Sequence, residues 1–365
     1  MNFFNLDYFR QIIEEPYLVR RCASKIKRTE CANNAVLVVA PCLVGEFVAM
    51  LPALFDFSER TDKTIDLMVT SPLKSLAERI VCVRNVFVAK SVAGRANEST
   101  SGAVSGTYEE VFLIRASRDV LQNVAPFISA SKVTTALQRM TRYALCDLLK
   151  NTVLRRRPTQ WRDFVFSLFD GRPKDIFFKD IFNFTKEEYE TIISRLRIGA
   201  KNKKILIHTG ASWPMMRWDK EKWALLLKDI HALGELDFIF IGQEKEREDY
   251  AYIASRLDFP VFSLIGQIDT AELLLLMNAA DYFIGIDSGP ANMAHLAGLR
   301  SIVLYGPGPH IYMSQDPNDI MLDKSGGRGL YQRFFLKKHG FIERITVEEV
   351  YGAFCKIWNN PKKNK

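Results

Sequence analysis

The sequence predicts an α/β protein made of two doubly wound domains, and three observations support this fold class. The chain has 365 residues, more than one ordinary domain needs and enough for two cores of similar size. Short apolar runs alternate with segments of helical periodicity in both halves. The alternation stops at a basic stretch and starts again near residues 175–200. We therefore expect a domain boundary in that region.

The composition is that of a soluble globular protein, with 48% hydrophobic and 25% charged residues. No apolar run approaches the ~20 residues that span a bilayer, and the first residues lack the pattern of a secretory signal. The six cysteines are scattered, without a C-x-x-C pair or a His at metal-ligand spacing. We expect reduced thiols, a cytoplasmic location and no metal. A net charge of +8 favours anionic partners such as nucleotides, phosphorylated saccharides, acidic lipids or nucleic acid.

The first half begins with a strand, a turn and a helix. Residues 35–40 are a β-branched apolar run, Pro41 and Gly45 follow as turn residues, and residues 47–57 have helical spacing. Short apolar runs of the kind that parallel sheets bury predict further strands at 65–69, 85–90 and 110–115. The Ser, Gly and Thr residues of 91–107 predict a loop between two of these strands.

Residues 132–162 form a basic stretch with apolar residues at helical intervals, which predicts a basic amphipathic helix. Its cations are Lys132, Arg139, Arg142, Lys150, Arg155, Arg156, Arg157 and Arg162. Two interpretations stay open: the solvated face of a linker helix, or contact with a membrane surface or an anionic acceptor. Beyond it, Thr185 and Glu188 have the spacing of a capping box that starts another helix.

The second half repeats the strand and helix alternation. A strand and loop are predicted at 205–211, further strands at 238–242, 282–286 and 301–306, and helices at 220–234, 271–280 and 290–298. Their order is typical of a Rossmann-like domain. A last helix is predicted at 347–358, after the second sheet is complete.

The sharpest functional signal is the strand-to-helix turn within residues 285–298. The strand ends at Asp287, turns through Ser288 and Gly289, and enters a helix at Pro290, and the hydroxyl of Ser288 is expected to cap that helix. Such a turn aims backbone amides and the positive end of a helix dipole at the edge where α/β sheets bind phosphates. A capped helix without a ligand has the same pattern.

Two more signals lie in the second half. Thr209, Gly210 and Ser212 form a loop that leaves a strand, and Arg217 beyond it carries a permanent charge able to hold an anion. Acids follow the next strand at the place where Rossmann-like domains read ribose hydroxyls, so Glu244 or Glu246 could serve there. The acids of an exposed helix start explain this second pattern equally well.

The fourth signal is in the first half, where Gly45 permits a tight turn and Glu46 places a carboxylate at the start of a helix. This carboxylate is expected at the carboxyl ends of the first sheet. A stabilising acid at a helix N-terminus is the competing interpretation.

Together, residues 45–52 (GEFVAMLP), 209–223 (TGASWPMMRWDKEKW) and 285–307 (GIDSGPANMAHLAG and SIVLYGP) resemble the bacterial heptosyltransferase family, glycosyltransferase family nine. The resemblance covers roughly residues 35–310. It implies the GT-B fold of two Rossmann-like domains facing across a cleft. It also implies binding of ADP-heptose or a related nucleotide sugar mainly in the C-terminal domain, and inverting transfer without a metal, often to the inner core of lipopolysaccharide.

By position, the resemblance makes Glu46 the catalytic base and places Gly45, Arg115 and Arg118 on the acceptor side. It assigns donor binding to Thr209, Gly210, Ser212, Arg217, Glu244, Asp287, Ser288, Gly289, Pro290, Ala291 and Asn292. Three positions depart from the family pattern: Glu46 stands where Asp is usual, Met216 where Lys is usual, and Asn292 where His is usual.

The resulting prediction is an acceptor domain at 1–185, a nucleotide-sugar domain at 186–345 and a helix within 346–365 that returns to the first domain. The expected activity is transfer of heptose from ADP-heptose to a saccharide acceptor, with no cofactor, no nucleic acid and peripheral contact with an anionic membrane. Alternatives are another GT-B enzyme, with a different nucleotide sugar, a protein acceptor or epimerase chemistry, and a non-catalytic nucleotide-sugar-binding protein.

Overall fold

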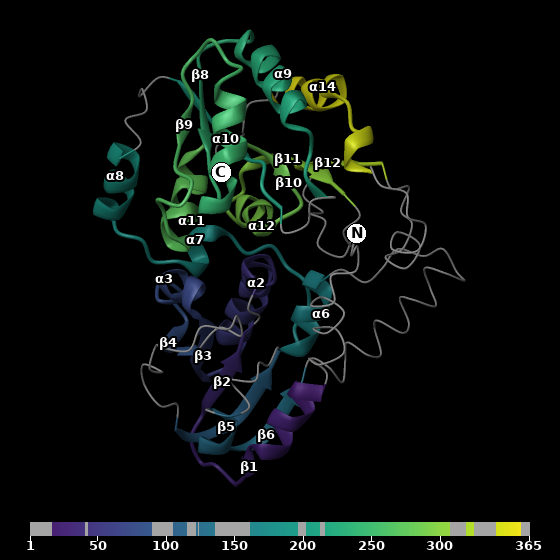
Figure 1. Ribbon diagram of the computed structural model, residues 1–365. Coiled ribbons are helices and arrows are strands. Elements are labelled where there is room, and N and C mark those ends of the chain that lie inside the picture. The colour runs from purple at the N-terminus through teal and green to yellow at the C-terminus, as the bar shows by residue number, and fades with distance from the viewer. Residues whose placement is uncertain are drawn as a thin grey trace. The chain divides into compact units, whose positions relative to one another are not determined.

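The computed structural model describes residues 17–40, 43–89, 105–114, 122, 124–135, 161–195, 202–211, 216–306, 319–324 and 341–358. These residues form two compact units, and the described residues of the first run from 17 to 183 and those of the second from 184 to 358 (Figure 1). Each unit contains one six-stranded sheet in which neighbouring strands are parallel. The predicted α/β class with two doubly wound sheets is confirmed.

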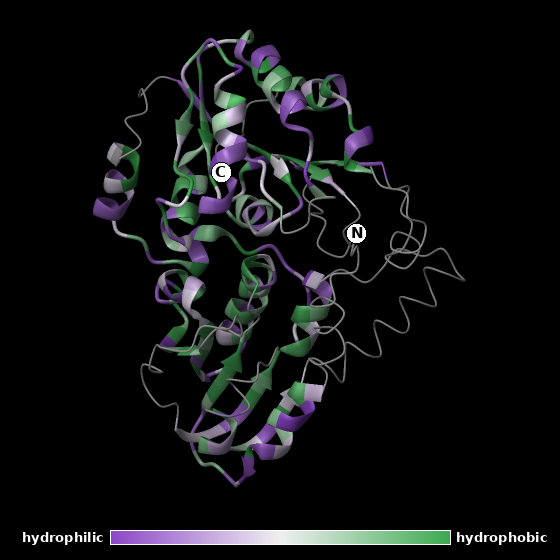
Figure 2. Cartoon of the chain, viewed as in Figure 1, coloured by the Kyte–Doolittle hydropathy of each residue, from purple (hydrophilic) through white to green (hydrophobic). Residues whose placement is uncertain are grey.

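The first sheet has the strand order β1-β6-β5-β2-β3-β4. Its strands are β1 (Lys27–Arg28), β2 (Ala35–Val39), β3 (Thr64–Thr70), β4 (Val83–Ala89), β5 (Gly106–Leu113) and β6 (Ile128–Thr135). The helices of this unit include α2 (Val44–Arg60), α3 (Lys74–Ala77), α6 (Trp161–Leu168) and α7 (Phe178–Ile181). All five residues of β2 are buried, and Figure 2 shows how apolar the central strands are compared with the helices, which keep polar faces.

Helix α2 buries its apolar side. The fully buried side chains there are Phe47, Met50, Leu51 and Leu54. Helix α6 packs against α2, and the Trp161 indole N–H donates to the Glu46 backbone carbonyl at 3.3 Å. The beginning of α2 is therefore held by a second helix as well as by the sheet.

The basic stretch corrects one expectation. Residues 132–135 do not begin a helix, because they continue β6 beside β5, where Lys132 pairs with Glu110. Arg162 lies in α6. The cations between them lie outside the described residues.

The second sheet has the order β12-β11-β10-β7-β8-β9. Its strands are β7 (Lys203–His208), β8 (Leu236–Phe240), β9 (Phe262–Ser263), β10 (Tyr282–Ile286), β11 (Arg300–Tyr305) and β12 (Asp319–Asp323). Its helices are α8 (Lys186–Arg195), α9 (Lys220–His231), α10 (Arg247–Ala254), α11 (Thr270–Ala279), α12 (Gly289–Leu296) and α14 (Val347–Trp358). The predicted capping box of α8 is confirmed by hydrogen bonds from Thr185 N to Glu188 and from Glu188 N to Thr185.

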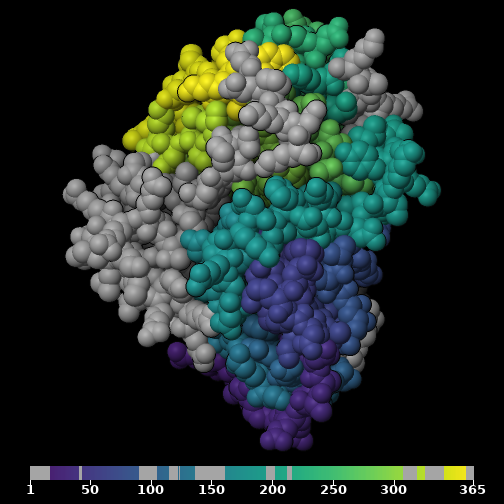
Figure 3. All heavy atoms as spheres, turned by 180° about the vertical axis from the view of Figure 1, so that it is seen from behind, coloured from purple at the N-terminus to yellow at the C-terminus, as the bar shows by residue number. Residues whose placement is uncertain are grey.

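The last helix, α14, is part of the second unit. The apolar face of α14, with Val350, Phe354 and Ile357, joins the core of the second unit, and α14 packs on α9 and β11. A return of this helix to the first domain stays a prediction. Figure 3 shows α14, in yellow, at the surface of the second unit beside the yellow-green β12, a strand that the sequence analysis did not predict.

Candidate functional site

The carboxyl ends of β7 and β10 form a topological switch point in the second sheet. These strands are neighbours, with His208 opposite Gly285, and the chain then proceeds to β8 on one side and to β11 on the other. In open α/β sheets, ligands bind in the crevice at such a point, because the loops after the two strands diverge. The two sharpest sequence signals of the second half, at Thr209 and at Asp287, follow these strands directly.

The turn from Asp287 to Asn292 leads from β10 into α12, as predicted. Gly289 and Pro290 begin the helix, so its first amides have no intrahelical acceptor and remain able to bind an anion. Asn292 donates its side-chain amide to the Ser288 carbonyl at 3.1 Å, which braces this first turn.

Ser288 corrects the expectation of a side-chain cap. Its hydroxyl makes no capping hydrogen bond. Instead it donates to the Ile286 carbonyl at 2.9 Å and lies 3.1 Å from Nδ1 of His208. The side chain is held toward the strands, so the backbone of the turn is what this segment offers to a ligand.

The loop after β7 brings Thr209 and Arg217 together at a pocket of about 150 Å³, which Trp218, Trp223 and Asp249 also line. Thr209 is buried, as are the next two residues of the loop. Ser212 lies outside the described residues. The predicted neighbourhood of the loop and the cation is therefore present.

Arg217 is held in place on two sides. Its guanidinium donates to the Ala211 carbonyl at 3.4 Å and lies 3.5 Å from a carboxylate oxygen of Asp249. Its Nε is buried and has no hydrogen-bond partner among the described residues. A buried N–H without an acceptor is costly, and an anionic or carbonyl oxygen of a ligand would satisfy it.

The two candidate ribose acids lie in different environments. Glu244 is exposed and pairs with Arg247, and its pKa is lowered chiefly by that hydrogen bond. Glu246 is buried, accepts from the Gln243 backbone amide at 2.9 Å, and has its pKa raised by burial. Of the two acids after β8, only Glu244 is therefore exposed to a ligand. Glu246 is buried inside the loop.

His208 is a residue of this edge that the sequence analysis missed. It is 5% exposed, and burial lowers the pKa of its imidazole to about 4. Its ring contacts Ser288 on one side and approaches Glu246 to 3.7 Å on the other. A histidine that ends a buried strand and precedes a Thr-Gly turn is the signal that could have identified it.

Comparison with known proteins bears on this edge directly. Residues 155–318 match the sequence model of glycosyltransferase family 9 (heptosyltransferase). This match covers less than half of the chain. A lipopolysaccharide heptosyltransferase 1 from Campylobacter coli is 29% identical over 185 residues, which cover 49% of this chain and 54% of that protein. The chain thus matches about half the length of this relative.

Solved structures resemble the chain over a greater length. A glycosyltransferase family 9 protein from Veillonella parvula has a TM-score of 0.70 at 15% identity and covers 91% of this chain and 99% of its own. An E. coli ADP-heptose lipopolysaccharide heptosyltransferase II has a TM-score of 0.66 at 17% identity, and the match covers 88% of this chain and 98% of that protein. At these identities the likeness shows the fold, which is the predicted GT-B fold.

The residues that match the family model include the whole switch point, whereas Glu46 precedes them. Glu46 lies in the first turn of α2, is 5% exposed and follows the half-buried Gly45. It lies just beyond the carboxyl end of β2, as predicted. Arg115 and Arg118, the other residues expected on the acceptor side, lie outside the described residues.

The described part of the chain offers neither a cluster of metal ligands nor a membrane-spanning helix. No group of three His, Cys, Asp or Glu side chains there could hold a metal ion. No helix in that part is both long enough and apolar enough to cross a bilayer.

Proposed function

We propose that this chain is an inverting glycosyltransferase that moves heptose from ADP-heptose to a saccharide acceptor such as the core of lipopolysaccharide. The observation that carries the proposal is the turn from Asp287 to Asn292 at the switch point, where first-turn amides of α12 face the edge of the sheet. The glycosyltransferase family 9 match over residues 155–318 supports the same activity. The similarity to a lipopolysaccharide heptosyltransferase and to an ADP-heptose lipopolysaccharide heptosyltransferase supports heptose as the sugar, ADP as the nucleotide and lipopolysaccharide as the acceptor.

In the proposed reaction, the second unit holds the donor. The backbone amides of Gly289 and Ala291, together with Thr209 and Arg217, stabilise the negative charge that grows on the departing diphosphate. Arg217 matters most here, because the usual Lys of the resembling family is replaced by Met216. Glu244 hydrogen-bonds the ribose hydroxyls.

The first unit supplies the base. The carboxylate of Glu46 removes the proton of an acceptor hydroxyl as that oxygen bonds to the anomeric carbon. The bond from that carbon to the diphosphate oxygen breaks on the opposite side, ADP leaves, and the configuration inverts. In this proposal no metal takes part, because the backbone amides of the turn and the guanidinium of Arg217 stabilise the negative charge of the departing diphosphate.

A nucleotide-sugar panel tests the proposal. We expect ADP-heptose to raise the melting temperature more than UDP- or GDP-linked sugars, since a ligand at 100 times its Kd stabilises the folded state by about 2.7 kcal/mol. Mass analysis after adding a lipopolysaccharide core acceptor should then show a heptosylated product. Equal shifts for the three nucleotides would refute the donor assignment, and binding without transfer would favour the non-catalytic alternative.

We further propose that the basic stretch 132–162 gives the protein reversible contact with an anionic membrane that carries the acceptor. Each Lys or Arg near such a surface contributes about 1 kcal/mol, and salt weakens the attraction. Changing Arg155, Arg156 and Arg157 to Gln is expected to reduce sedimentation with acidic vesicles at low salt and to leave transfer to a short soluble acceptor unchanged. Unaltered sedimentation would mean that these arginines are only a solvated surface.

A further inference from the structure

His208 contacts the loops of neighbouring strands at the switch point. It ends β7, its Nδ1 lies 3.1 Å from the Ser288 hydroxyl beyond β10, and its Nε2 lies 3.7 Å from the Glu246 carboxylate beyond β8. Strands β8, β7 and β10 are adjacent in the sheet. One buried imidazole therefore connects the ends of the strands whose loops form the candidate donor site.

The hydrogen-bond pattern favours a proton on Nδ1 of the ring. The Ser288 hydroxyl has one proton, which it donates to the Ile286 carbonyl at 2.9 Å. The contact between Ser288 and His208 therefore needs a proton from Nδ1 of the imidazole. Burial lowers the pKa of His208 to about 4, so the ring is neutral near pH 7 and Nε2 presents a lone pair toward Glu246.

The Glu246 carboxyl group lies on the Nε2 side of the His208 ring, and its position is fixed by the loops around it. A Cβ at Gly210 would lie 2.0 Å from the Glu246 carboxyl carbon, and a Cβ at Gly242 would lie 2.0 Å from its Oε2. The carboxyl group therefore fills the room that these glycines leave, between the loops after β7 and β8. Burial raises the pKa of Glu246, whose Oε2 lies 3.7 Å from Nε2 of His208.

We propose that His208 is a positioning residue whose Nδ1–H fixes Ser288 and thereby aims the backbone amides of the 289–291 turn at the donor diphosphate. The imidazole acts through Ser288 and does not itself contact the ligand. Because Ser288 is held toward the strands, the amides after it face the edge of the sheet. This inference rests on the proposed function, in which the turn holds the diphosphate.

Two amide substitutions separate the ring nitrogens. The side-chain nitrogen of Asn is as many bonds from the backbone as Nδ1 of His, and that of Gln is as many as Nε2. His208→Asn can therefore still donate to Ser288, whereas His208→Gln places its donor toward Glu246. The readouts, on the full chain, are hydrogen exchange of the Asn292 amide, which donates to the Ser288 carbonyl at 3.3 Å, and ADP affinity by calorimetry.

We expect His208→Asn to keep both readouts within about 3-fold of the parent, and His208→Gln to raise the exchange rates and the Kd for ADP about 10-fold, as for a lost buried hydrogen bond. Ser288→Ala removes the acceptor and should match His208→Gln, with no further effect in the double variant. His231→Gln is the matched control. That histidine lies in α9 and stacks on Phe259, so its change should leave the turn and the ADP affinity unaltered.

Equal behaviour of the Asn and Gln variants in the exchange of the turn would overturn the inference, as would a Ser288→Ala variant that exchanges like the parent. The exchange readout does not depend on a ligand. If the Asn and Gln variants differ in exchange as expected but the parent does not bind ADP, the positioning role stands and the proposed function fails.

Discussion

Replacing Glu46 by Gln is expected to lower the rate of heptosyl transfer about 10²–10⁴-fold, the usual contribution of a general base. The substitution keeps the size of the side chain and its place in the first turn of α2, where the residue is 5% exposed. It removes only the ability to accept the proton of the acceptor hydroxyl. Single-turnover transfer from saturating ADP-heptose measures the effect on the chemical step.

Controls distinguish a base from a stabilising acid at a helix N-terminus. A purely stabilising carboxylate there contributes about 0.3–1 kcal/mol, so its loss would lower the melting temperature slightly and leave the transfer rate alone. Glu59→Gln makes the same chemical change at an exposed position of α2 and should keep the parent rate. Glu46→Asp, with the acid usual in the resembling family, should retain more activity than Glu46→Gln. Near-parent transfer by Glu46→Gln would reject the base assignment.

The elements that the sequence predicted well are those with strong local patterns. The strand at 282–286 and the helix at 347–358 have the predicted bounds, because a buried apolar run and an amphipathic face are both visible in a short window. β12 was missed, since Asp319 and Asp323 flank only three apolar residues. β6 was read as part of a helix, because its polar residues lie near the edge of the sheet and join a basic stretch.

The candidate site was predictable where one turn determines it, and not where distant segments meet. The turn at Asp287, which we propose binds the diphosphate, follows from a strand end, a glycine and a helix start in sequence. The role of His208 depends on Ser288, 80 residues away, and no local pattern records that contact. Glu244 and Glu246 are two positions apart, and only the direction of the turn between β8 and α10 leaves one exposed and buries the other.

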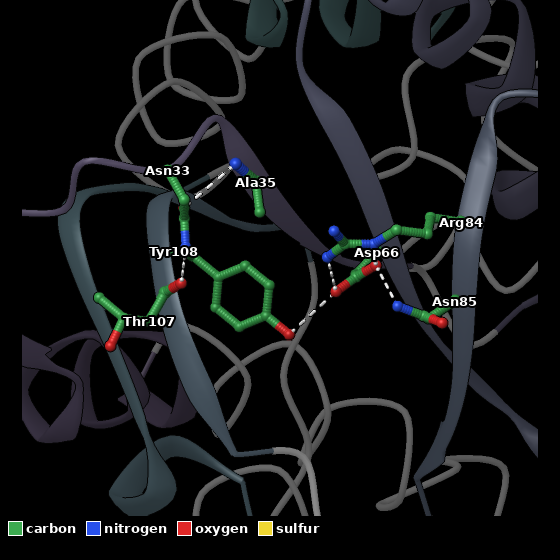
Figure 4. A network of polar contacts seen from close by, with 7 residues as sticks. All are labelled: Asn33, Ala35, Asp66, Arg84, Asn85, Thr107 and Tyr108. Carbon is green, nitrogen blue, oxygen red and sulfur yellow. Dashed lines mark hydrogen bonds and ion pairs between the residues drawn. The ribbon is translucent and has the colours of Figure 1, made fainter.

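The first unit contains a buried charge whose partners the sequence also did not reveal. Asp66, in the middle of β3, is 2% exposed (Figure 4). Its two carboxylate oxygens accept from Arg84 at 3.0 and 2.9 Å, from the Asn85 amide at 2.9 Å and from the Tyr108 hydroxyl at 3.2 Å. Burial, and then the charge of Asp66, raises the pKa of Tyr108. The carboxylate thus links β3 to the adjacent β4 and, across β2, to β5.

Asp66→Asn is expected to destabilise the first unit by about 3 kcal/mol. This value is near the lower end of the range for breaking a buried ion pair, because the half-exposed Arg84 can be solvated by water once its partner is lost. The amide has one acceptor oxygen where the carboxylate has two, so its NH2 group faces donors that lose their partner. Hydrogen exchange of the buried amides of β2 and β3 in the full chain should accelerate about 100-fold. Glu109→Gln makes the same change in the half-exposed pair with Lys63 and should cost at most about 1 kcal/mol. If the two variants exchange alike, the Asp66 network contributes no more to stability than a surface pair, and the sheet is held by its apolar core alone.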